Sequence, residues 1–211
     1  MSLYYGNTKI GSLYLGSDKI KEAYYGNVKV FGSSDPYNPL GLPPFTLRCK
    51  FSQGYTPDRG YTQTLVDSTN NVWDITTESS EYAWDDLFAS CTDLLEVLGI
   101  NSTGVQEMYG TFNICESLER VPHTFDTSSV TTIGEMFSAC SSLRELPDLP
   151  VDRVSDCSRA FGNCSNVESG ALNMYNKLSQ VATTYTQCFL NCGSNTTTGA
   201  AELAQIPSDW K

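Results

Sequence analysis

Basic residues and histidine are scarce in this sequence. It has 13 Lys and Arg against 24 Asp and Glu, which gives a net charge of −11, and its only histidine is His123. Proteins that bind nucleic acid need a basic patch that displaces counterions from the phosphates. The charge therefore argues against a nucleic-acid partner and indicates an acidic, well-solvated surface.

Long apolar runs are missing as well. No stretch approaches the length of a membrane-spanning helix, and the segment 1–6 has neither the basic nor the continuous apolar region of a signal peptide. We therefore expect no membrane insertion. The sequence predicts a protein that is made in the cytoplasm without a signal peptide.

Motifs of catalysis and of cofactor binding do not occur. The sequence has no phosphate-binding glycine loop followed by Lys and Ser or Thr, no dinucleotide fingerprint and no Cys-x-x-Cys pair. A serine or cysteine nucleophile would depend on His123, and an exposed loop position is the simpler interpretation of that residue. We expect a protein that is not an enzyme and holds no cofactor or metal.

Residues 1–32 contain a ten-residue repeat with a glycine at the same place in each copy. A glycine beside Asn or Ser, between a Tyr-rich and an Ile- or Val-rich run, predicts a tight hairpin turn. Three such hairpins bury too little apolar surface to be stable alone, so this β-rich module either pairs with another subunit or particle, which we favour, or folds back on its own chain. The candidate assembly residues are Tyr5, Gly6, Tyr14, Gly16, Tyr25 and Gly26.

A domain boundary is predicted at residues 33–44, where four prolines and a glycine disfavour regular structure and indicate a linker. Beyond it, apolar residues alternate with polar ones from Phe45 to Ser52, which predicts a half-buried strand. A hairpin is predicted around the turn-rich segment 67–71. Together these strands would form a small β-sheet cap over residues 45–83.

From residue 84 to the end at 211 the chain repeats every 24 to 28 residues, and the last residues would form a C-terminal cap. The repeat is anchored by a Phe-x-x-Cys motif, followed in four copies by an apolar residue three positions later. A period in the twenties with Leu-x-x-Leu steps is typical of a leucine-rich-repeat solenoid. The anchors are Phe88, Cys91, Phe112, Cys115, Phe137, Cys140, Phe161, Cys164, Phe189 and Cys192.

A helix is expected in each repeat. Val105, Met108, Phe112 and Cys115 are spaced by 3, 4 and 3, which places them on one helical face, and two later repeats have the same spacing. The predicted fold class is therefore α+β, a leucine-rich-repeat solenoid of one strand and one helix per unit, preceded by a small β-rich module.

The eight cysteines all occupy apolar positions: Cys49 in the predicted strand, five at the repeat anchors, and Cys157 and Cys188 at places that are apolar in other repeats. A disulfide framework or a zinc site would be the functional alternatives, and the nearest candidate is the pair Cys188 and Cys192. Free thiols buried in the core are the favoured interpretation.

The segment 130–143, Val-Thr-Thr-Ile-Gly-Glu-Met-Phe-Ser-Ala-Cys-Ser-Ser-Leu, resembles the unit of BspA-like leucine-rich repeats over about residues 84–192. The insertion at 170–178 departs from that pattern and looks like an extra helix. This resemblance implies a solenoid and a role in bacterial surface adhesion. The tandem at the N-terminus and the segment 196–211 are similar to virion proteins of phages and prophages of gut bacteria, among them fibre proteins.

These resemblances imply a phage virion structural or fibre protein whose repeat head binds the host cell surface, through a surface protein or a glycan. It would be a homo-oligomer, with a trimer favoured, in contact with other virion proteins. A passive capsid or tail decoration protein and a bacterial BspA-like adhesin are the alternatives.

Overall fold

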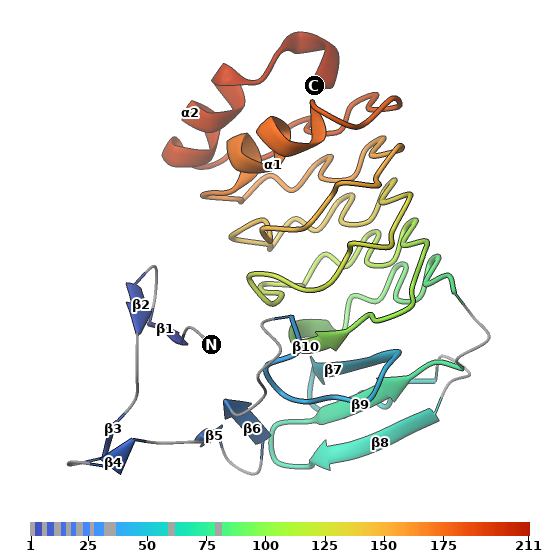
Figure 1. The fold of residues 1–211 in the computed structure, drawn as a ribbon, viewed down its shortest axis with the longest axis vertical. Coiled ribbons are helices and arrows are strands. Elements are labelled where there is room, and N and C mark those ends of the chain that lie inside the picture. Colours follow the sequence, from blue (N-terminus) through green and yellow to red (C-terminus); the bar gives the residue numbers. More distant parts are fainter. Residues whose placement is uncertain are drawn as a thin grey trace.

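The structure is a computed structural model, drawn in Figure 1. It describes residues 37–58, 62–78 and 82–211 with their side chains. In the first 36 residues it describes only the backbone of six strands.

The six N-terminal strands pair consecutively as three two-stranded antiparallel sheets. Each pair spans one copy of the ten-residue repeat, in agreement with the predicted hairpins. The strands are β1 (Leu3–Tyr5), β2 (Thr8–Ile10), β3 (Tyr14–Leu15), β4 (Asp18–Lys19), β5 (Ala23–Tyr25) and β6 (Val28–Phe31).

A four-stranded antiparallel sheet with the order β10-β7-β9-β8 follows. Its strands are β7 (Thr46–Phe51), β8 (Thr62–Asp67), β9 (Val72–Thr76) and β10 (Leu94–Asn101). The alternation in the sequence gives the sheet two different faces. Leu47 pairs with Ile75 on the buried face, and Arg48 pairs with Asp74 on the other, where Nε lies 2.6 Å from Oδ1.

The described end of the proline-rich segment lies against this sheet. Leu40 and Leu42 are buried, and a Cβ atom at Gly99 of β10 would overlap the side chain of Leu40. The Asn38 side chain bonds both the N–H and the carbonyl of Leu42 at 2.8 Å, and Asn101 Nδ2 donates to the same carbonyl at 2.6 Å. Residues 38–42 are therefore anchored on the sheet.

Beyond the sheet, segments of 24 to 28 residues lie one above another as irregular turns (Figure 1). We number these turns one to five by their anchor phenylalanines, from Phe88 to Phe189. Single parallel bridges join them in a long ladder along one side, through Ala83, Glu107, Thr132, Asp156 and Thr184. On the other side a short ladder joins Glu96 to Arg120 and Glu145 to Ser169.

The predicted fold class, a leucine-rich-repeat solenoid with a strand and a helix in each unit, is wrong. Beyond the N-terminal strand pairs, the α-helices and multi-residue strands of the described residues are one small four-stranded antiparallel sheet and two short helices, and both helices lie after residue 170. The 3-4-3 spacing reflects consecutive turns instead of a helical face. Left-handed residues recur four positions apart, as at Asp86 (φ 53°) and Ser90 (φ 61°), and such residues end a right-handed helix.

The backbone N–H and carbonyl groups of this chain find hydrogen-bond partners in the turns, so no helix is needed to satisfy them. In the first turn Asp86, Phe88 and Ser90 donate their N–H groups to carbonyls of the next turn, at 2.7 to 2.8 Å. The N–H groups of the intervening Leu87 and Ala89 bond carbonyls three residues back. Alternate amides thus bond within and between turns, so few buried donors are left unsatisfied.

Two helices close the far end of the stack, α1 (Ala171–Leu178) and α2 (Thr197–Gln205), followed by the short helix η1 (Ser208–Trp210). The extra helix predicted for the insertion is confirmed as α1. Trp210 stacks on Tyr185, with ring centroids 4.2 Å apart. The carbonyl of Trp210 also accepts from Phe189 N–H at 2.9 Å. None of the helices in the described part of the chain has the length and apolar composition needed to cross a membrane.

Candidate binding site

The five anchor phenylalanines lie in one buried column. Phe88, Phe112, Phe137, Phe161 and Phe189 are each at most 1% exposed. Consecutive rings are 5.2 to 6.1 Å apart and within 22° of parallel. This stack forms the centre of the molecule and offers no binding surface.

The anchor cysteines hold neighbouring turns together. Cys115, Cys140 and Cys164 donate their Sγ–H groups to the carbonyls of Phe88, Phe112 and Phe137 in the preceding turns, at 3.0 to 3.1 Å. Cys91 has no earlier repeat beneath it, and its thiol contacts Tyr55 Oη at 3.7 Å. The anchor position thus needs a small apolar side chain that can also donate, which describes a thiol.

These thiols are poor nucleophiles and poor metal ligands in the folded protein. Burial raises the pKa of Cys164 to about 12 and raises the pKa values of Cys49, Cys140, Cys188 and Cys192. Only the thiolate attacks or binds metal. Within the described ranges all eight cysteines are buried and none forms a disulfide, and no cluster of three metal-binding side chains occurs.

Polar side chains from successive turns form rows on the surface. Thr131, Ser155 and Thr183 each donate a hydroxyl hydrogen to a carbonyl of the preceding turn, at 3.2 to 3.3 Å. Beside the short ladder, the charged side chains alternate in sign from one turn to the next. Arg144, for example, pairs with Glu168 of the following turn at 3.8 Å. Each row repeats one side chain per turn on a backbone fixed by hydrogen bonds.

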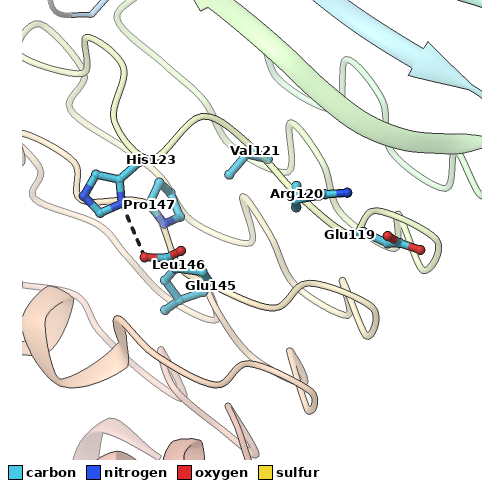
Figure 2. A pocket seen from close by; sticks show the side chains of 7 residues that line it. All are labelled: Glu119, Arg120, Val121, His123, Glu145, Leu146 and Pro147. Carbon is cyan, nitrogen blue, oxygen red and sulfur yellow. Dashed lines mark ion pairs between the residues drawn. The ribbon is translucent and has the colours of Figure 1, made fainter. Parts of the chain in front are cut away.

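A small pocket of about 90 Å³ interrupts the charged side of the stack. It lies between the second and third turns, and Figure 2 shows the imidazole of His123 facing the carboxylate of Glu145 across it. Nδ1 of His123 is 3.4 Å from Oε1 of Glu145, and both side chains are at least half exposed. The residues that line the pocket are Glu119, Arg120, Val121, His123, Glu145, Leu146 and Pro147.

The pocket can form hydrogen bonds, and its composition does not suit nucleophilic catalysis. His123 has a carboxylate neighbour, but no lining residue carries a hydroxyl or a thiol that it could activate. His123 was noticeable in the sequence as the only histidine, but its partner Glu145 was not. A repeated Pro, at 122 and 147, was the signal that these two segments occupy equivalent places in consecutive turns.

The candidate assembly residues are only partly described. Tyr5, Tyr14 and Tyr25 lie in strands β1, β3 and β5. Gly6, Gly16 and Gly26 lie outside the described residues. The role of these six residues in assembly stays a prediction.

Three comparisons with known proteins complete the description. Neither the curated proteins nor the solved structures gave a match. A family model described as "Mycoplasma protein of unknown function, DUF285" matches residues 82–200, which include the five anchor motifs and the whole segment that resembles BspA-like repeats. Since this match covers more than half of the 211 residues, the chain belongs to the DUF285 family.

Proposed function

We propose that this protein is a non-enzymatic binding protein that attaches a particle to a cell surface through the stack of turns. The observation that carries the proposal is the set of exposed rows, in which one polar side chain per turn is held on a fixed backbone. Such a surface binds without first ordering flexible loops, and this lowers the entropic cost of association.

The chemistry of the interior supports a binding role over a catalytic one. The thiols are buried, burial raises the pKa of Cys164 to about 12, and the only histidine faces a carboxylate in a pocket without a nucleophile. Catalytic sites need titratable groups that converge with a nucleophile or an oxyanion site. The lining of this pocket offers hydrogen bonds and apolar walls instead.

The N-terminal hairpins and the resemblance to phage proteins support a virion as the particle that carries this protein. Under this proposal the protein is a virion structural or fibre protein, residues 1–32 assemble copies of the chain, with a trimer favoured, and the rest of the chain projects and binds the cell surface. A passive capsid or tail decoration protein and a bacterial BspA-like adhesin remain the alternatives.

Cell binding is the direct test. Fluorescently labelled full-length protein is incubated with a panel of gut bacteria and bound fluorescence is measured by flow cytometry, with unlabelled protein as competitor. We expect saturable binding to some strains. Binding to no strain would contradict the proposal and favour a decoration protein.

Assembly is tested separately, by light scattering on the full chain and on a chain that begins at Tyr37. This start keeps residues 38–42, which are anchored on the sheet. We expect an oligomer for the full chain and a monomer for the shortened one. Two monomers would remove the support for a fibre.

A further inference from the structure

The short ladder is broken where the pocket lies. Between the first and second turns Val97 N–H donates to Arg120 O at 2.9 Å, and between the third and fourth Leu146 N–H donates to Ser169 O at 3.1 Å. The equivalent bond between the second and third turns would run from Val121 N–H to Glu145 O. It is not formed, and neither group has another hydrogen-bond partner among the described residues.

The gap is short, because the two turns are bonded to each other on both sides of it. On one side of it Arg144 N–H bonds Glu119 O at 3.3 Å, and on the other Asp148 N–H bonds His123 O at 2.6 Å. An extended peptide that adds to an open edge needs a row of open amides and carbonyls. This opening instead fits a single amide group of a ligand.

The other residues that line the pocket restrict the class of ligand further. Val121, Leu146 and Pro147 form apolar walls next to the open donor and acceptor. His123 lies on one side of them and Glu119 and Arg120 on the other (Figure 2). The Arg120 side chain is 68% exposed and also pairs with Glu96 at 3.6 Å. Carboxylate and guanidinium groups form paired hydrogen bonds, which match adjacent sugar hydroxyls.

We propose that this pocket binds the N-acetyl group of an amino sugar, as part of a cell-surface glycan. The acetamido oxygen accepts from Val121 N–H, its N–H donates to Glu145 O, and its methyl group rests on Val121, Leu146 and Pro147. The ring hydroxyls bond Glu119, Arg120 and His123. This inference rests on the proposed cell-surface function and names the ligand class for it.

The test uses the full-length protein and the trisaccharide of N-acetylglucosamine, with a neutral trisaccharide of glucose as the control ligand. A pocket of this size predicts a dissociation constant of about 1 mM. We expect the Val121 amide resonance to shift on titration, and saturation-transfer NMR to show the acetyl methyl protons as the closest part of the sugar. An unmoved Val121 resonance, or equal binding of the glucose trisaccharide, would overturn the proposal.

Two substitutions test the contact to the acetamido group and the contact to a ring hydroxyl separately. Val121→Pro removes the N–H that makes no bond within the described protein, so it should abolish the preference for the N-acetylated sugar. His123→Ala should weaken its binding roughly three- to tenfold through one lost hydrogen bond. Glu168→Gln changes an exposed charge outside the pocket and should leave binding unchanged.

Each outcome bears on the proposal. If Val121→Pro does not fold, the Val121 resonance of the unaltered protein decides. Normal sugar affinity in folded Val121→Pro would overturn the proposal. If labelled protein binds cells but shows no response to the N-acetylated trisaccharide, this inference fails while the proposed cell-binding function stands.

Discussion

At the scale of single residues, the anchor cysteines combine two requirements that few side chains meet together. Cys115, Cys140 and Cys164 fill buried positions next to stacked phenylalanines and also donate to a carbonyl of the preceding turn. The donor exists only while the thiol is protonated. Burial raises the pKa of Cys140 and of Cys164, so these two donors persist above pH 9.0, where an ordinary thiol ionises.

The raised pKa values predict that stability falls at high pH. A thiol ionises near pH 9.0 in the unfolded chain, whereas Cys164 resists ionisation until about pH 12 when folded. The stabilisation is complete below about pH 9 and is lost as pH rises towards 12, by up to about 1.4 kcal/mol per pH unit for each such thiol. Urea denaturation at pH 7, 9 and 10 measures this change, and Cys164→Ala should show a shallower decline. An equal decline in both proteins would contradict the assignment.

Left-handed residues form a second column, one per turn, at Ser90, Ile114, Ala139, Asn163 and Asn191. Ile114 is the unfavourable member, because a β-branched side chain at φ 59° crowds the backbone, and it is also 40% exposed. Asparagine tolerates this conformation and occupies the equivalent place in turns four and five.

Ile114→Asn should therefore increase the free energy of unfolding, by about 1 kcal/mol. For a chain of this length that corresponds to a rise in melting temperature of about 2 to 4 °C, measured by calorimetry. The matched change Asn163→Ile should destabilise the protein by a similar amount. A lower melting temperature for Ile114→Asn would show that the apolar contacts of Ile114 outweigh the backbone strain.

At the scale of elements, α2 depends on one capping residue. Thr196 Oγ1 accepts from Gly199 N–H at 3.0 Å and lies 2.7 Å from Val167 O, to which its hydroxyl donates. The same side chain thus caps the helix and ties it to the fourth turn. A Cβ at Gly199 would overlap Val167 O, so the helix begins as close to that turn as a backbone can.

Thr196→Ala should lower the free energy of unfolding by about 1 to 2 kcal/mol, the cost of losing an N-cap. Thr196→Ser retains the hydroxyl and should remain within a few tenths of the original value. Guanidinium denaturation of the three proteins checks this difference. Equal losses for Ala and Ser would indicate that the methyl group, and not the hydroxyl, supports the helix.

At the scale of the whole molecule, the sheet joins the proline-rich segment to the stack of turns. Leu40 and Leu42 pack over Gly99 on β10, and β10 itself continues into the short ladder through Glu96 and Arg120. A chain that begins at Pro43 loses these contacts, whereas one that begins at Tyr37 keeps them.

The chain that begins at Pro43 should be less stable than the chain that begins at Tyr37, by about 3 to 6 kcal/mol, since burying each of the two leucine side chains contributes about 1.5 to 3 kcal/mol. Urea denaturation of the two shortened chains measures the difference. Identical midpoints would show that residues 38–42 do not stabilise the sheet.

Local patterns in the sequence predicted the strands and the anchors better than the connections between them. The alternation around Leu47 and Cys49 became β7, and the turn-rich segment 67–71 lies between β8 and β9. The anchor phenylalanines and cysteines are all buried. The helix in each repeat was wrong, because 3-4-3 spacing arises from consecutive turns as well as from helices.

The sequence alone did not predict the pocket. His123 was visible as the only histidine, but its proximity to Glu145 depends on how turn two lies against turn three. Nothing in the sequence around Val121 distinguishes an amide that is bonded from one that is open. That difference depends on the position of a carbonyl 24 residues away, in the next turn.

The sequence by itself determined which residues are buried and how often they recur, because apolar period and residue size are properties of the chain. Only the tertiary structure decided that the repeats are turns, that thiols donate to carbonyls of the preceding turn, and that one hydrogen bond between turns is left open. These features depend on donors and acceptors in different turns meeting in space, and that geometry exists only once the turns are stacked.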